Sequence, residues 1–172
     1  MAHPISLLGA VHTVISIAPV VAGLYGFLRT RGIDASSRSG QVYLGGLFLS
    51  VATSFGLSST GKFNAGHALG LLALAAALGG VVVQRLGFLG RLRPYLSAAG
   101  LSFSFFLLLV PGINETLSRL PPSHPIGNGI ESPVVRGALL GWVALFVVGM
   151  GVQMWTVHAR SRSPRIHART AG

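Results

Sequence analysis

The chain has 172 residues, of which 51% are hydrophobic and only 9% are charged. Soluble domains carry about 25% charged residues, so this composition and a mean hydropathy of +0.67 exclude an ordinary soluble fold and predict an integral membrane protein. The net charge of +10 lies at the ends of apolar segments, which indicates membrane topology and contact with anionic lipid headgroups rather than with nucleic acid. The absence of cysteine excludes disulfides, thiolate metal sites and thiol catalysis.

The first apolar segment, residues 4–28, is long enough to cross a hydrocarbon core of ~30 Å. Small and polar residues recur along it at steps of three and four, at Gly9, His12, Ser16, Pro19, Gly23 and Gly26. That spacing places them on one helix face. Since the rest of the segment is apolar, this face is expected to pack against other helices while lipid covers the remainder.

Four further membrane spans are predicted, at residues 41–59, 65–83, 94–110 and 134–156. Each of them repeats the pattern of small residues at steps of three and four, which permits close approach of helix backbones. The positions are Gly46, Ser50 and Thr53; Gly66, Gly70, Ala73, Ala77 and Gly80; Ser97, Gly100 and Ser104; and Gly137, Gly141, Ala144, Val148 and Gly151. We therefore predict an all-α bundle of five transmembrane helices within residues 1–158.

Two polar segments complete the predicted organisation. Residues 111–133 are expected to form an outer loop, in which residues 114–120 could form a short surface helix with Glu115 paired to Arg119. Residues 159–172 form a basic tail without apolar periodicity, and it is expected to lie on lipid headgroups through Arg160, Arg162, Arg165 and Arg169.

The basic residues also predict an orientation. Ten of them follow the first, third and fifth spans, and three (Lys62, Arg119 and Arg136) lie on the other side. By the positive-inside rule, the N-terminus is outside and the C-terminus is cytoplasmic in a multi-pass protein of the cell inner membrane.

Two histidines are the candidates for chemistry, because this topology places both in the outer half of the bundle. His12 lies about two turns into the first span and His67 lies near the start of the third. Two neutral imidazoles on facing helices suit the axial positions of a b-type haem, or part of a metal site. The alternative is that they bind no cofactor and hydrogen-bond across helices to Ser16, Ser50, Thr53 or Ser104.

Two functions from different classes follow. The first is a membrane-embedded redox or binding module, with a role in electron transport, that holds haem or a metal between His12 and His67. The second is a non-catalytic accessory or structural subunit that packs against a membrane-protein partner or a second copy of itself. The only acids are Asp34, Glu115 and Glu131, and all lie outside the predicted spans, which disfavours a proton-coupled transporter. No nucleophile motif, phosphate loop or acid pair indicates an enzyme.

Four motifs, which together touch most of the chain, carry a resemblance. They are Leu7-Leu-Gly-Ala-Val-His12, Ser39-Gly-Gln-Val-Tyr-Leu44, Phe63-Asn-Ala-Gly-His67 and, most specifically, Val110-Pro-Gly-Ile-Asn-Glu-Thr-Leu-Ser-Arg-Leu-Pro121. In these the chain resembles a group of small, uncharacterised bacterial multi-span membrane proteins, known only as a domain of unknown function. The resemblance implies fold and topology but no reaction. It also implies a histidine near the opening of the second span, where this chain has Ser36-Ser-Arg-Ser-Gly40, so only the outer pair remains for a cofactor.

Overall fold

The computed structural model describes residues 7–57 and 63–162, and all regular structure in these two ranges is helical. The elements are α1 (Leu7–Thr30), α2 (Arg38–Ser54), the 3-10 turn η1 (Phe55–Leu57), α3 (Ala65–Val83), the 3-10 segment η2 (Gly87–Leu92), α4 (Arg93–Arg119) and α5 (Pro133–Arg162). Five helical segments are long and apolar enough to cross a membrane. They are α1, α2 with η1, α3, η2 with α4, and α5. The predicted all-helical class, with five helices that are long and apolar enough to span a membrane, is confirmed for the described residues.

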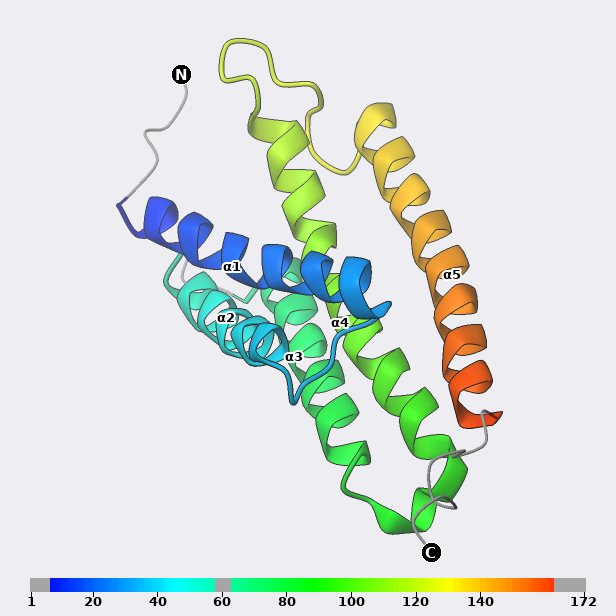
Figure 1. Ribbon diagram of the computed structural model, residues 1–172. Coiled ribbons are helices and arrows are strands. Elements are labelled where there is room, and N and C mark those ends of the chain that lie inside the picture. Colours follow the sequence, from blue (N-terminus) through cyan, green and yellow to red (C-terminus); the bar gives the residue numbers. More distant parts are fainter. Residues whose placement is uncertain (1–6, 58–62, 163–172) are drawn as a thin grey trace, which may run out of the picture.

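The helices form two hairpins and a fifth helix at the edge. α1 pairs with α2, α3 pairs with α4, and α5 packs against α4. In Figure 1, α3, α4 and α5 run along the length of the molecule, whereas α1 runs across it. The N-terminal half of α1 therefore depends mainly on α2 for its contacts inside the protein.

The helix bounds differ from the predicted spans at the second, fourth and fifth spans. α3 covers the predicted residues 65–83, and α1 lies within one turn of its expected end. α2 ends at Ser54 and tightens into η1, so the α-helix does not continue to residue 59 as expected; residues 58 and 59, like residues 4–6 of the first span, lie outside the described residues.

The fourth helix was predicted to end at Val110, before Pro111 and Gly112, but it continues beyond this point. α4 continues through Pro111 to Arg119, so residues 111–119 of the predicted loop are helical. The proline removes one backbone hydrogen bond, to the carbonyl of Leu107, but the groups on either side keep their helical partners, and a membrane helix tolerates this loss. The expected pair of Glu115 and Arg119 is present at 2.6 Å on the last turn of α4.

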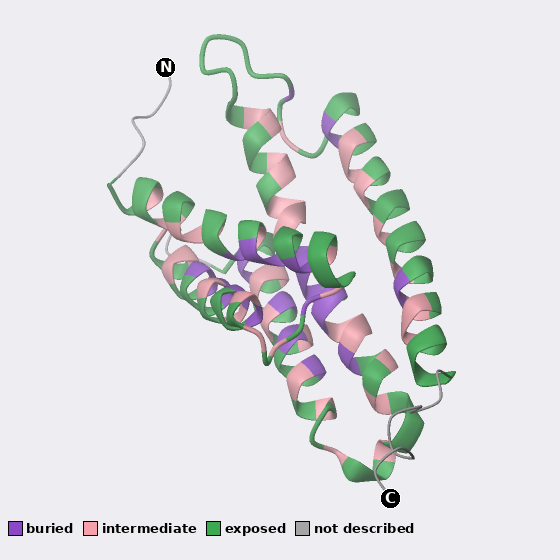
Figure 2. Ribbon diagram, viewed as in Figure 1, coloured by how far each residue is buried: buried purple, intermediate pink, exposed green. Residues whose placement is uncertain are grey.

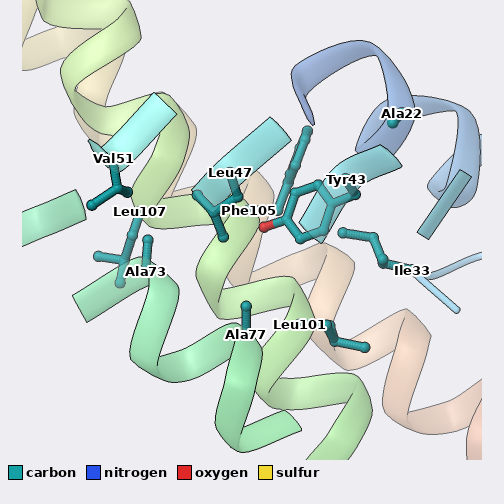
Figure 3. Packing of buried hydrophobic residues seen from close by; sticks show 10 residues of the cluster. All are labelled: Ala22, Ile33, Tyr43, Leu47, Val51, Ala73, Ala77, Leu101, Phe105 and Leu107. Atoms are coloured by element: carbon teal, nitrogen blue, oxygen red, sulfur yellow. The ribbon is translucent and has the colours of Figure 1, made fainter. Parts of the chain in front are cut away.

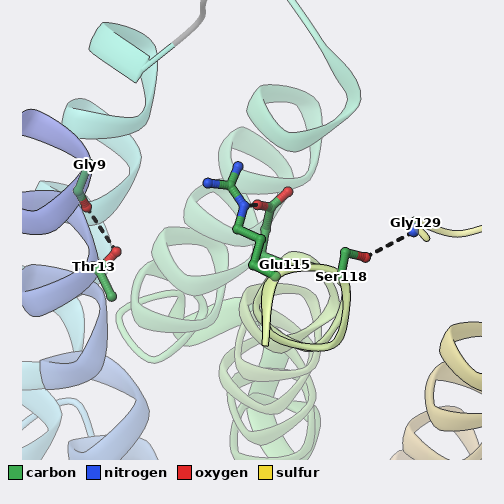
Figure 4. A network of polar contacts seen from close by, with 6 residues as sticks. Gly9, Thr13, Glu115, Ser118 and Gly129 are labelled. Carbon is green, nitrogen blue, oxygen red and sulfur yellow. Dashed lines mark hydrogen bonds and ion pairs between the residues drawn. The ribbon is translucent and has the colours of Figure 1, made fainter. Parts of the chain in front are cut away.

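The connection after α4 folds back on the end of that helix. The backbone N–H of Gly129 donates to the Ser118 hydroxyl at 3.0 Å (Figure 4). The N–H of Gly127 donates to the Leu117 carbonyl at 3.0 Å. Hydrogen bonds thus hold residues 126–129 of the connection against the end of α4, while residues 120–126 are exposed.

α5 is longer than the predicted span and takes in the beginning of the basic tail. It continues to Arg162, so residues 159–162, including Arg160, are helical. Arg165 and Arg169 lie outside the described residues.

The buried residues gather between α2, α3 and α4, while most of α5 is exposed (Figure 2). The largest fully buried side chains include Tyr43, Leu47 and Leu101, and the cluster around them continues to Phe105 and Ala77 (Figure 3). Small residues of α3 face this cluster, because Ala73 and Ala77 have no exposed surface. The core is therefore the meeting point of the two hairpins.

The basic connections meet at one end of the bundle. Arg160 near the end of α5 donates to the carbonyl of Thr30 at the end of α1, at 3.3 Å. Tyr95 at the start of α4 and His158 on α5 are joined by a hydrogen bond of 3.0 Å.

Candidate functional site: two histidines bonded to the α2 helix

The polar face of α1 lies against α2 in antiparallel register. Pro19 faces Gly46, where a Cβ atom would come within 2.7 Å of the proline ring. One turn along, the hydroxyl groups of Ser16 and Ser50 lie 2.6 Å apart. Steps of three and four residues on both helices thus bring the two predicted small faces together as one contact.

His12 extends this contact toward the N-terminal end of α1. Its Nδ1 lies 2.8 Å from Oγ1 of Thr53 on α2, and its Nε2 lies 3.4 Å from Oγ of Ser16. The Thr53 hydroxyl donates its one proton to backbone carbonyls of its own helix, so it must accept from an Nδ1–H of His12. Nε2 then carries no proton and accepts a hydrogen bond from the Ser16 hydroxyl.

This assignment gives the hydrogen bonds a single direction. Ser50 donates to Ser16, Ser16 donates to His12, and His12 donates to Thr53. The four side chains of the two helices therefore satisfy one another with the imidazole neutral. A neutral, bonded imidazole is the form that an apolar surrounding favours.

His67 is fixed in a different way, at the N-terminus of α3. Asn64 caps this helix, with its side chain accepting from the N–H of His67 at 3.0 Å, while Nδ1 of His67 accepts from the N–H of Asn64 at 3.3 Å. The two residues form a capping box in which histidine takes the position usually held by glutamate or glutamine. The sequence Asn64-Ala-Gly-His67 carries that signal, although from the sequence His67 was predicted only as a cofactor ligand or as an interhelical hydrogen-bonding residue.

The remaining nitrogen of His67 joins α3 to α2. Because Nδ1 accepts, Nε2 carries the proton and donates to the carbonyl of Ser54 at 3.0 Å. The ring is buried and stacks on Phe55 with a centroid distance of 4.6 Å. His67 is thereby held by three groups from two segments of the chain.

The structure places the two histidines at the same level of α2, since they bond to the consecutive residues Thr53 and Ser54. They approach different sides of that helix turn, and no hydrogen bond or ring contact joins the two imidazoles in the described part of the chain. Ser104 bonds to neither histidine: its Oγ lies 2.5 Å from the Tyr43 hydroxyl and donates to the carbonyl of Leu101.

A haem or metal between the rings would need one free nitrogen on each. In this arrangement all four ring nitrogens take part in hydrogen bonds, although the bond from Ser16 is long. Ligation by His67 would require loss of its bond to Asn64 or to Ser54. As they are placed, the two side chains do not fit axial ligation.

Two polar pairs elsewhere in the bundle were missed by the sequence analysis. The Ser102 hydroxyl donates to Oε1 of the buried Gln153 at 2.6 Å, which joins α4 to α5. Nε2 of Gln84 donates to Oγ of Ser97 at 2.7 Å, which joins the end of α3 to α4. Glutamines are uncommon in this chain, and their position near the end of apolar segments was the available signal.

The chain matches no protein-family model, no curated protein and no solved structure in comparisons with each. The residues and their contacts therefore carry the functional argument.

Proposed function

We propose that the chain is a non-catalytic, multi-span membrane protein that acts as an accessory or structural subunit of a larger assembly. The observation that carries this proposal is that every ring nitrogen of His12 and His67 takes part in a hydrogen bond, and that one nitrogen of each ring joins its own helix to α2. Interhelical hydrogen bonds of this kind are a common role for polar side chains in membrane bundles.

The outer face of α5 supports the assembly part of the proposal. The predicted seam of this helix, Gly137, Gly141, Ala144, Val148 and Gly151, is exposed throughout. The residues of α5 that do face α4, among them Trp142 and Gln153, lie on the opposite side of the helix. Small residues at these steps permit another transmembrane helix to pack closely, whereas contact with lipid alone does not require them.

The chain lacks cysteine, so a single introduced thiol can test this face. A photoreactive maleimide on Gly141→Cys, in the native membrane, is expected to give a cross-linked protein band. Val143→Cys is the matched control, since Val143 is exposed on the same helix but, two residues further on, lies nearly half a turn away from Gly141. A band of twice 17.8 kDa indicates a second copy, and another mass indicates a different subunit. Equal labelling of both variants, or no protein band, would contradict the proposal.

The haem or metal hypothesis for His12 and His67 makes an opposite prediction that can be measured separately. A structural role predicts that detergent-purified protein is colourless and free of bound metal. A reducible Soret band and alpha band that disappear in both His12→Ala and His67→Ala would instead establish the redox module and refute the structural role.

We also propose the inner membrane as the location, with the N-terminus outside and the C-terminus in the cytoplasm. The last turns of α1 and α5 and the first turn of α4 lie together on one side of the bundle, where they are joined by hydrogen bonds. These segments and the connections next to them carry most of the arginines, which supports this orientation. A reporter that is active only in the cytoplasm is expected to function when it is fused after Gly172 and to fail when it is inserted at Gly129.

A further inference from the structure

A cleft of about 410 Å³ opens at the basic end of the bundle, apart from both histidines. The connection between α1 and α2, the end of α3, and the start of α4 form its walls. Its volume lies within the range of about 300–1,000 Å³ that is typical of sites for small ligands.

The cleft contains two opposite charges that do not neutralise each other. Asp34 and Arg93 both line it, yet neither forms an ion pair with the other or with any residue in the described part of the chain. Ser36 bonds to only one carboxylate oxygen of Asp34, with its N–H at 2.9 Å and its hydroxyl at 2.6 Å. The other oxygen of Asp34 has no hydrogen-bond donor among the described residues, so it can accept from a ligand.

Arg93 is likewise only partly used. Its Nε donates to the carbonyl of Gly90 at 3.3 Å, and Gly90 adopts a φ of +47°, a conformation that favours glycine. This contact fixes the arginine at the edge of the cleft and leaves the terminal nitrogens of the guanidinium available. A guanidinium with free N–H groups binds phosphate oxygens in a bidentate manner.

A buried hydroxyl group, that of Ser97, also belongs to the lining of the cleft. Ser97 has 3% of its surface exposed, lines the cleft, and among the described residues has Gln84 as its one hydrogen-bond partner, from which it accepts. Its own proton can therefore be donated to an anion. Ile33 and Ala98 provide the apolar part of the lining.

The position of the cleft defines the class of ligand. It lies where the apolar run of α3 has just ended and that of α4 begins, which is the depth of lipid headgroups if these helices span the bilayer. Many arginines at this end attract any anionic lipid, but a free carboxylate adds a requirement for a cation with N–H donors. We propose that the cleft binds a phosphoethanolamine group, with the phosphate on Arg93 and Ser97 and the ammonium on Asp34.

The test is a titration of the detergent-purified full chain, with thermal stability as the readout. The probes are short-chain phosphatidylethanolamine, phosphatidylcholine and phosphatidylglycerol, and free phosphoethanolamine. Phosphatidylethanolamine is expected to raise the unfolding midpoint at the lowest concentration, since the choline headgroup has no N–H to donate and the glycerol headgroup has no positive charge. Saturation by free phosphoethanolamine at similar concentrations identifies a soluble ligand, and saturation by the lipid alone identifies a headgroup.

Two variants and one control make the assignment specific. Arg93→Gln and Asp34→Asn are each expected to weaken the effect of phosphatidylethanolamine by about tenfold or more, the size of a lost hydrogen bond to a charged group. Asparagine keeps the oxygen that accepts from Ser36, so the local turn is retained. Arg91→Gln removes the same charge from a residue outside the cleft and should leave the effect unchanged. Equal response to all three lipids, or an equal loss in Arg91→Gln, would overturn the proposal.

Discussion

The contact between α3 and α4 gives the sharpest stability prediction, because one substitution has opposite effects at two glycines of this hairpin. Gly100 of α4 lies against the backbone of α3, where an added Cβ would come within 2.8 Å of the Ala76 carbonyl and 3.0 Å of the Gly80 Cα. At Gly79 of α3, no atom from another segment of the described chain lies within 4 Å of the Cβ position. Neither backbone group at Gly100 can rotate aside as a flexible side chain could.

The expected sizes follow from two terms. Replacing glycine with alanine inside a helix stabilises it by about 0.5–1 kcal/mol. Overpacking a close contact costs about 1–3 kcal/mol. Gly79→Ala should therefore raise the free energy of unfolding by the first amount. The free energy of unfolding of Gly100→Ala should be about 1–3 kcal/mol lower than that of Gly79→Ala. The gain in helix propensity is common to both variants, so the difference between them measures the overpacking.

Unfolding of purified protein in mixed micelles, followed by loss of helical circular dichroism on addition of a denaturing detergent, measures this difference. If Gly100→Ala is as stable as Gly79→Ala, the close packing of α3 on α4 is refuted. A loss of stability in Gly79→Ala would instead show that this face of α3 is covered by something else.

Three further predictions use the same unfolding assay. Thr53→Val keeps the shape of the side chain but removes the acceptor for His12, and should cost about 0.6 kcal/mol of stability, with about 1.7 kcal/mol as the upper limit for such bonds. The control is Thr13→Val, which should cost less, because the Thr13 hydroxyl bonds within its own helix. Asn64→Ala removes the cap of α3 and should cost about 1 kcal/mol, with faster amide exchange confined to the first turn of that helix. Ser102→Ala should destabilise the native protein yet have little further effect in Gln153→Leu, and full additivity of the two would contradict the bond between them.

For α1 and α2, residue spacing alone predicted which helix faces pack inside the protein, but it could not identify their partners. The small face of α1 and that of α2 meet as complementary surfaces, with Pro19 against Gly46 and Ser16 against Ser50. The equivalent face of α5 follows the same spacing and packs against nothing in the described chain. A stripe of small residues thus indicates that a backbone can be approached closely, while the identity of the approaching helix depends on three-dimensional arrangement.

The errors at helix ends have a different cause. Pro111 was interpreted as a helix end because proline lacks an N–H, but the helix around it continues and only one bond is lost. The capping role of His67 was missed because its ring can act as ligand, donor or acceptor, and sequence does not reveal which of these is used. In each case the outcome depends on the surrounding structure, which cannot be inferred from the local sequence.

The polar side chains of the bundle together specify how its helices pair. Lipid is as apolar as leucine, so apolar surfaces alone give little preference for one helix partner over another. Each unpaired polar group, in contrast, is costly in hydrocarbon, so only arrangements that join donors with acceptors are stable. The observed bonds each join a different pair of helices: His12 with Thr53 for α1 and α2, His67 with the Ser54 carbonyl for α2 and α3, Tyr43 with Ser104 for α2 and α4, Gln84 with Ser97 for α3 and α4, and Ser102 with Gln153 for α4 and α5. The two histidines are thus members of a set that distinguishes this arrangement from other ways of packing five apolar helices.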